Sequence, residues 1–273
     1  MHKRRILTVT IIVSAIYVAL MTVFTFYDYQ ITDGLFNRGT LFGKIFESIG
    51  PTFMPFFMMY SVISLFSFLK FKKKTGKVFA YIGLGFSLLY ACFMGVMTHK
   101  HSYAYWTFIP SIIVYASFMV LSFYINKKIK GMDEDFQRLH VSIILVMFIT
   151  ASVSLMGVDI IKSIFGRVRY LNLSDASLFK PWYYINSVDF NSSFPSGHVS
   201  RAMTAICFSL IPLYFKENVW HYVVEVLAVV FAVIVSVSRL LEGMHYPTDV
   251  LTGAYLTFIA FYISKYCFID KKW

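Results

Sequence analysis

The chain has 273 residues, of which 58% are hydrophobic and 14% are charged. A soluble domain carries about 25% charged residues, so this composition argues against an ordinary soluble domain and indicates a membrane protein. The formal net charge of +11 raises the alternative of a nucleic-acid-binding protein. The basic residues, however, lie in short clusters between apolar runs, as in membrane-protein loops, and we therefore expect no nucleic-acid partner.

Eight apolar runs are candidates to cross a bilayer, which needs about 20 residues for each helix. They are Ile6–Phe26, Thr52–Leu69, Val78–Met97, Thr107–Tyr124, Val141–Ile161, Val199–Phe215, Tyr222–Val237 and Val250–Phe268. We expect the first run to be a retained helix rather than a signal peptide, because it lacks a clear small-residue cleavage site. No linker divides the chain, so the predicted fold is a single all-α, polytopic membrane bundle over residues 1–273.

The distribution of Lys and Arg predicts how this bundle is oriented. Most of these residues lie in 3–5, 70–77 and 127–138, which fall on one side of the membrane if there are eight spans. The positive-inside rule makes that side, with both termini, cytoplasmic. On the other side, Leu35–Gly50 is amphipathic and predicts an interfacial helix after the first span, although a loop helix packed on the bundle fits the same pattern.

Cysteine chemistry is not expected to contribute to function. Cys92, Cys207 and Cys267 all lie inside apolar runs, and none has the spacing of a metal ligand. We therefore interpret them as packing residues, with no disulfide and no zinc site.

The pentapeptide Phe194-Pro195-Ser196-Gly197-His198 lies where a polar loop ends and an apolar run begins. A helix that starts near Gly197 would point its free backbone N–H groups back at this segment. Those groups, the Ser196 hydroxyl and a glycine without Cβ suit a bound anion, and His198 adds a proton donor at the rim. The tripeptide Ser-Gly-His alone is a weak signal.

Two further polar clusters follow apolar runs. After the fifth run, Lys162 and Arg169 are seven residues apart, about two helical turns, and can face one point. The alternative is that these cations only anchor a helix end. After the seventh run come Ser238-Arg239 and then His245 and Asp249, four residues apart. A carboxylate at that spacing can hold one imidazole nitrogen and leave the other free, or can serve as a structural cap.

On the eight-span count, all three clusters emerge on one membrane face. Lys162, Arg169 and Arg239 around the backbone nest at Ser196-Gly197 suit a dense anion such as phosphate. Two histidines suit a nucleophile and a general acid. Neither a carboxylate cluster nor a Cys/His set for a metal accompanies them, so the sequence predicts metal-independent phosphoryl transfer without a cofactor.

These clusters closely resemble the three motifs of the type 2 phosphatidic acid phosphatase superfamily, the lipid phosphate phosphatases. The first motif corresponds to Lys162 and Arg169 with six residues between them, the second to Pro195–His198, and the third to Ser238-Arg239 with His245 and Asp249. Tyr170 stands where the family usually has proline. Family members commonly have six spans, so two N-terminal spans are additional here. We accordingly divide the chain into N-terminal spans, 1–140, and a catalytic core, 141–273.

The resemblance implies a role for each matching residue. His245 would attack phosphorus and form a phosphohistidine, Asp249 would orient His245, and His198 would protonate the leaving oxygen. The phosphoryl oxygens would be held by Lys162, Arg169, Ser196, Gly197 and Arg239. Arg201 stays outside this set, because it could add a fourth cation or pair with Glu242.

The sequence therefore predicts a lipid phosphatase of the plasma membrane with its site on the outer face. It would remove the terminal phosphate of a lipid mono- or diphosphate, with undecaprenyl diphosphate, phosphatidylglycerophosphate and phosphatidic acid as candidate substrates. A transporter or binding protein for an anionic lipid or phosphate is the first alternative, and a vanadate-type haloperoxidase is the second.

Overall fold

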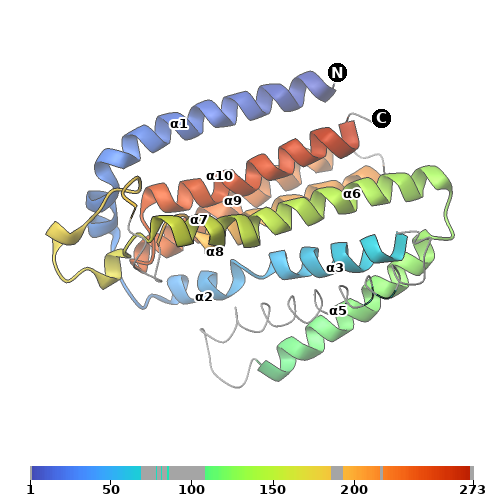
Figure 1. Ribbon diagram of the computed structural model, residues 1–273, viewed down its shortest axis with the longest axis horizontal. Helices are drawn as coiled ribbons and strands as arrows, with labels where there is room; N and C mark the ends of the chain where they lie inside the picture. The colour runs from blue at the N-terminus through green and yellow to red at the C-terminus, as the bar shows by residue number, and fades with distance from the viewer. Residues whose placement is uncertain are drawn as a thin grey trace.

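The computed structural model describes residues 2–68, 78, 81, 85, 108–185, 193–215 and 218–270. Long helices packed lengthwise make up this part of the chain (Figure 1). They are α1 (His2–Leu35), α3 (Phe53–Phe68), α5 (Phe108–Ile129), α6 (Glu134–Ser152), α9 (Asn218–Leu241) and α10 (Pro247–Lys265). The shorter helices are α2 (Leu41–Ile49), α7 (Val158–Phe165) and α8 (Gly197–Met203). The all-α prediction is confirmed for the described residues.

Within the described residues, six segments are long and apolar enough to cross a membrane. They are Ile6–Leu35, Leu41–Phe68, Ile112–Ile129, Glu134–Asn172, Val219–Leu241 and Pro247–Ile269. These segments overlap the first, second, fourth, fifth, seventh and eighth predicted spans, which makes this a multi-pass membrane protein. The third predicted span, Val78–Met97, lies almost entirely outside the described residues.

The sixth predicted span, Val199–Phe215, differs from the regular α-helix that the sequence suggests. The α-helix ends at Met203, and the chain continues as a 3-10 helix over Thr204–Phe215, which contains Pro212. Proline has no backbone N–H to donate and disfavours a continuous α-helix. A 3-10 helix rises about 2 Å per residue against 1.5 Å in an α-helix, so the two pieces together cover roughly 35 Å.

The packed core lies between α3, α6, α10 and this 3-10 helix. Ile143, Val146, Ile206, Leu210 and Phe261 are completely buried there. Large apolar side chains on the outward faces of α1, α5 and α9, by contrast, remain exposed. Because lipid tails are as apolar as these side chains, close packing rather than transfer out of water stabilises such a bundle.

The chain termini lie together at one end of the bundle, and the α1–α2 connection, α7 and the beginnings of α8 and α10 lie at the other end (Figure 1). Chain segments that are far apart in sequence therefore meet at the end opposite the termini. Together with the end of α9, which carries Ser238 and Arg239, these segments bear the three predicted motifs.

The amphipathic segment after the first span forms α2, whose first turn is capped by Thr40 accepting a hydrogen bond from the Gly43 N–H at 2.9 Å. Phe46 packs against the buried cluster that contains Val235 of α9. Leu41 and Ile45 on the same helix remain exposed. The helix is thus packed on the bundle, as one of the two interpretations expects, while it keeps an apolar exposed face.

Candidate active site

The loop that carries Ser196 is held against the first turns of α10. The Ser196 backbone N–H donates to the Asp249 carbonyl at 2.9 Å, and the Ser196 hydroxyl accepts from the Val199 N–H at 3.4 Å, so Ser196 begins α8 as predicted. A Cβ on Gly253 would lie 2.3 Å from the Ser196 carbonyl oxygen. Glycine is required at position 253 because the two backbones approach this closely.

The first motif reaches the second through Lys162. Helix α7 ends at Gly166, whose positive φ of 54° allows the chain to turn and whose N–H donates to the Lys162 carbonyl at 3.1 Å. The Lys162 side chain lies over Gly197, since a Cβ on that glycine would be 3.8 Å from Lys162 Nζ. The predicted cation therefore faces the beginning of α8, where the free N–H groups point.

His245 is buried, and its ring orientation follows from its partners. Its Nδ1 lies 2.8 Å from the Ser193 carbonyl and 3.6 Å from Asp249 Oδ2. The sequence predicts Asp249 as the partner that holds this nitrogen, whereas the nearest acceptor is the Ser193 backbone. A carbonyl oxygen can only accept, so Nδ1 carries the proton and the Nε2 lone pair is left available.

Asp249 acts on this histidine partly through Ser193. The Ser193 hydroxyl donates to Asp249 Oδ2 at 2.5 Å and lies 3.4 Å from His245 Nδ1. The same carboxylate oxygen accepts the Tyr246 N–H at 2.8 Å, which caps α10 from within its first turn as predicted. Asp249 thus fixes both the helix beginning and the residue that holds His245.

The electrostatic environment keeps both histidines neutral. Burial lowers the pKa of His245 to about 4, the Asp249 carboxylate opposes this shift, and the charge of Lys162 adds to it. Burial and the charges of Arg239 and Arg201 lower the pKa of His198 well below its usual value. A neutral imidazole has a free lone pair, which a nucleophile needs. Because cations depress the pKa of His198, a bound anion would raise it again.

The two predicted arginines differ in how they are held. Arg239 is completely buried and donates from Nη2 to the Gly43 carbonyl of α2 at 2.6 Å. Its Nη1 lies 3.5 Å from Glu47, also on α2. Arg169 makes a weak contact from Nη1 to Met244 Sδ at 3.6 Å. Its positive charge contributes to lowering the pKa of His245, which places it near that ring.

Arg201 pairs with a different acid from the one considered in the sequence. Its Nη2 lies 3.8 Å from Asp159 Oδ2. Glu242 instead accepts the Gly39 N–H at 3.0 and 3.1 Å and the Thr40 hydroxyl at 3.3 Å. The pairing with Glu242 is therefore wrong, and Glu242 serves to tie the α1–α2 connection to the end of α9.

Across the described part of the chain, no group of three or more His, Cys, Asp or Glu is placed to hold a metal ion. Cys207 is buried and Cys267 exposed, both as free thiols, while Cys92 lies outside the described residues. The side chains that converge at the motif-bearing end are Lys, Arg and His, a set suited to an anion.

Residues 139–273 match the PAP2 superfamily model. This region, just under half of the chain, belongs to the PAP2 superfamily. The matched region contains all three motifs. Phosphatidylglycerophosphatase B of Bacillus subtilis (strain 168) is 33% identical over 115 residues, which cover 37% of this chain and 53% of that protein. The chain thus aligns with about half the length of this relative. No solved structure matches the chain.

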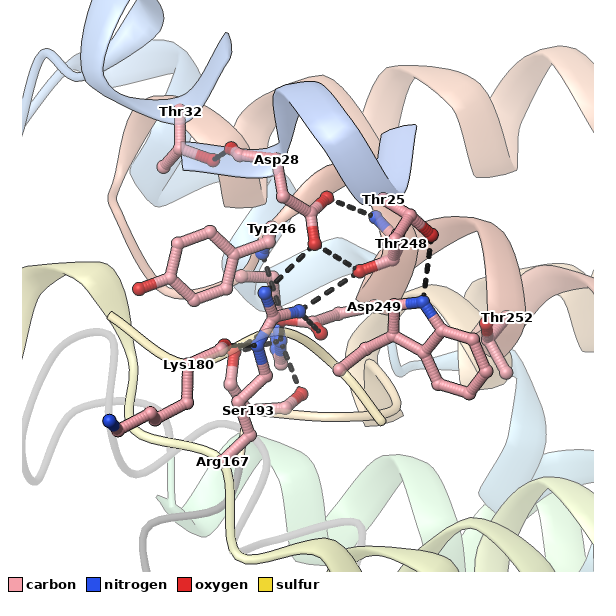
Figure 2. Close-up of polar contacts among 12 residues, drawn as sticks. Thr25, Asp28, Thr32, Arg167, Lys180, Ser193, Tyr246, Thr248, Asp249 and Thr252 are labelled. Atoms are coloured by element: carbon pink, nitrogen blue, oxygen red, sulfur yellow. Dashed lines mark hydrogen bonds and ion pairs between the residues drawn. The ribbon is translucent and has the colours of Figure 1, made fainter. Parts of the chain in front are cut away.

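Sequence reasoning missed Arg167, which lies in the PAP2 match and is buried beneath the site (Figure 2). Its Nη1 donates to Asp249 Oδ1 at 2.6 Å, and its Nη2 donates to Asp28 Oδ2 of α1 at 2.8 Å. Its Nε donates to the Lys180 carbonyl at 3.1 Å. The sequence does contain a signal for its partner Asp28, which is an acid at the end of an apolar span. Ionisable residues are rare there and are usually paired.

The departure from the PAP2 motif at Tyr170 also involves α1. The Tyr170 hydroxyl donates to Asp33 Oδ1 at 2.5 Å, and its ring packs 5.1 Å from that of Phe36. The Trp182 Nε1–H donates to the Thr25 hydroxyl at 2.9 Å. The turn after Arg169 is therefore fastened to α1 through the tyrosine that stands in place of proline.

Proposed function

We propose that this PAP2 protein is a metal-independent lipid phosphatase that forms a phosphohistidine on His245. The observation that carries the proposal is the state of this imidazole: neutral, buried and donating from Nδ1 to the Ser193 carbonyl, which directs a free Nε2 lone pair away from that support. An anion-binding protein needs cations and N–H groups but does not need a histidine held in a nucleophilic tautomer.

In the first chemical step, His245 Nε2 attacks phosphorus and the bond from phosphorus to the leaving oxygen breaks. His198, whose pKa rises when the phosphate binds, gives its proton to that oxygen. Charge develops on the phosphoryl oxygens in the transition state. The groups assigned to hold those oxygens are Lys162, Arg169, Arg239, the Ser196 hydroxyl and the Gly197 N–H.

In the second step, water attacks the phosphohistidine. His198, now unprotonated, takes a proton from the water as the oxygen bonds to phosphorus. The bond between phosphorus and His245 Nε2 breaks, and inorganic phosphate leaves. Asp249 and Ser193 hold the imidazole through both steps, so the nucleophile returns in the same tautomer.

The proposed substrate is a membrane lipid that carries a terminal phosphate. Phosphatidylglycerophosphate is our first choice, because a relative that is 33% identical over 115 residues is called phosphatidylglycerophosphatase B. Undecaprenyl diphosphate and phosphatidic acid present the same terminal group. Such lipids would enter from the bilayer with the phosphate at headgroup height.

We place the site on the outer face of the plasma membrane and both termini in the cytoplasm. The connection between α5 and α6 lies at the bundle end that holds the termini, and the last turn of α5, the connection and the start of α6 carry Lys127, Lys128, Lys130 and Arg138. This positive charge favours a cytoplasmic location for that end. The predicted count of eight spans, being even, puts both termini on the same side. For the sixth of these spans, the roughly 35 Å covered by α8 and the 3-10 helix together exceeds the hydrocarbon thickness of about 30 Å.

The test is phosphate release from these three lipids by the purified protein in detergent with a chelator present. We expect turnover by the wild-type protein and none by His245→Ala, which should still bind the lipid. Wild-type protein quenched in alkali should contain base-stable, acid-labile phosphate that the variant lacks. Turnover by His245→Ala, or a strict requirement for a divalent metal, would refute the mechanism.

The same preparation separates the alternatives. Lipid binding without phosphate release by the wild-type protein would favour a transporter or binding protein. Bromide oxidation that depends on added vanadate would favour a haloperoxidase.

A further inference from the structure

Helix α1 lies outside the region that matches the PAP2 superfamily, yet it buries a carboxylate beneath the candidate site. Asp28 is 1% exposed. Its Oδ2 accepts a hydrogen bond from Arg167 Nη2 at 2.8 Å, and its Oδ1 accepts the Thr248 N–H at 2.9 Å. The Thr248 hydroxyl also donates to Asp28 Oδ2. Both oxygens of this carboxylate are therefore committed to the groups that support the site.

A continuous series of contacts leads from Asp28 towards the nucleophile, and Figure 2 shows its members Asp28, Arg167, Asp249 and Ser193. Arg167 joins Asp28 to Asp249, with the second ion pair at 2.6 Å. Ser193 then joins Asp249 Oδ2 to His245, through its hydroxyl and its backbone carbonyl respectively. Each group, His245 included, is at most 2% exposed, so water does not screen these charges effectively.

The series from Asp28 to Ser193 contains two carboxylates and one guanidinium, so its formal charges do not cancel. Asp28 and Asp249 share the single guanidinium of Arg167, which leaves a formal charge of −1 next to His245. When His245 Nε2 bonds to phosphorus, its ring acquires positive charge. A residual negative charge close to that ring favours the transition state more than the ground state. If Asp28 were neutral, Arg167 would compensate Asp249 fully and this effect would be lost.

We propose that Asp28 of α1 is a positioning residue for the phosphatase reaction, acting by sharing Arg167 with Asp249. It holds the guanidinium in place, ties the first turn of α10 through Thr248, and leaves the charge of Asp249 available to His245. The N-terminal helix is thus part of the catalytic unit. The inference rests on the proposed phosphatase function.

The test compares Asp28→Asn with Asp33→Asn in the full-length protein. Asp33 lies on the same helix and accepts one hydrogen bond from Tyr170, but within the described part of the chain it has no hydrogen bond or ion pair with Arg167 or Thr248. Asp28→Asn should lower kcat roughly tenfold with KM within about twofold, because Asp28 acts through Arg167 and Asp249 on charge that develops only in the transition state. Asp33→Asn should keep kcat within about twofold.

Inhibition provides a readout that a merely structural role would not move. Vanadate adopts the five-coordinate geometry of the transition state, whereas phosphate resembles the bound product. Asp28→Asn should weaken vanadate inhibition by about the same factor as kcat and leave phosphate inhibition unchanged. Asp33→Asn should alter neither.

Three results bear against the inference in different ways. If the wild-type protein is active and Asp28→Asn has its kcat and vanadate affinity, the positioning role is wrong while the phosphatase assignment stands. An equal loss of vanadate and phosphate binding in Asp28→Asn would show a general structural role and overturn the proposal. If the wild-type protein releases no phosphate from any lipid, the proposed function fails first.

Should Asp28→Asn not yield monodisperse protein, Asp28→Glu gives the same comparison with the buried charge retained. The additional methylene displaces the carboxylate from Arg167 and Thr248. We expect a lower kcat and weaker vanadate inhibition with unchanged phosphate inhibition, and wild-type values for both would overturn the proposal.

Discussion

Replacing Arg167 by glutamine tests whether the buried network supports the site end of the bundle. The substitution removes the cation between Asp28 and Asp249, whose side chains are 1% and 0% exposed. It also removes the contact of the guanidinium with the Tyr246 ring, 4.0 Å from its centroid. Breaking a buried ion pair typically costs about 3–5 kcal/mol because the partner is left charged and buried. Two carboxylates lose their partner here, so the upper part of this range applies.

The assay is thermal unfolding of the purified protein in a fixed detergent. For a protein of this size, about 1 kcal/mol corresponds to roughly 2–4 °C, so Arg167→Gln should lower Tm by about 8–20 °C. Arg138→Gln is the matched control, because Arg138 pairs with Glu134 at 3.0 Å but both side chains are more than 60% exposed. An exposed pair contributes at most about 1 kcal/mol, so its Tm should stay within about 4 °C.

Arg167→Lys refines the same experiment. Lysine keeps the positive charge, but an ammonium group cannot reproduce the planar fork that reaches both carboxylates and the Lys180 carbonyl. Its Tm should fall between those of wild type and Arg167→Gln. A Tm of Arg167→Gln within 2 °C of wild type would refute the reasoning that this network stabilises the fold.

Three further predictions concern acidity, the histidine support and the turn beside α1. Because burial lowers the pKa of His245 to about 4, the ring stays unprotonated above that pH, so the acid limb of the kcat/KM profile should lie near pH 4. An acid limb near 6.5 would contradict this. Ser193→Ala removes the hydroxyl between Asp249 and His245. Steady-state kinetics should show kcat reduced about tenfold with KM unchanged, whereas a rise in KM as large as the fall in kcat would argue against an orienting role. Tyr170→Phe loses the hydrogen bond to Asp33, which contributes about 1 kcal/mol, so we expect Tm to fall by about 2–4 °C and kcat to stay unaltered. A large fall in kcat would show instead that this turn orients Arg169.

The sequence predicts the parts of the fold that depend on local pattern. The length of the apolar runs locates six of the eight expected spans among the described residues. The three motifs predict a shared anion site, and in the structure the Lys162 side chain lies over Gly197. The 3-10 geometry of Thr204–Phe215 was not predictable from hydrophobicity, because apolar content does not distinguish helical pitch. Pro212 is the one local feature of that run that disfavours a continuous α-helix.

The sequence does not predict contacts that depend on tertiary packing. The Ser193 carbonyl that holds His245 has no side-chain signal, since every residue carries the same backbone group. Arg167 appears in the sequence as one more cation beside Arg169, and only the packing of α1 against α10 shows that it joins Asp28 to Asp249. Arg201 could be assigned to either of two acids until the fold placed Asp159 next to it.

Gly253→Ala tests whether the close approach of α10 sets the position of the anion nest. The new Cβ would lie 2.3 Å from the Ser196 carbonyl oxygen and 3.3 Å from the Ser196 nitrogen, so the backbones must separate by about 1 Å to restore ordinary contact. Overpacking of this kind costs typically 1–3 kcal/mol, or a fall in Tm of about 2–12 °C.

The matched control is Gly34→Ala on α1, where a Cβ would meet nothing within 4 Å. Alanine is favoured over glycine in a helix by about 1 kcal/mol, so this variant should keep or raise Tm. Because Ser196 and Gly197 are assigned to hold the phosphoryl oxygens, Gly253→Ala should also weaken both phosphate and vanadate inhibition, unlike Asp28→Asn. Wild-type inhibition constants in Gly253→Ala would show that Ser196 does not bind the phosphoryl group through the position that α10 imposes on it.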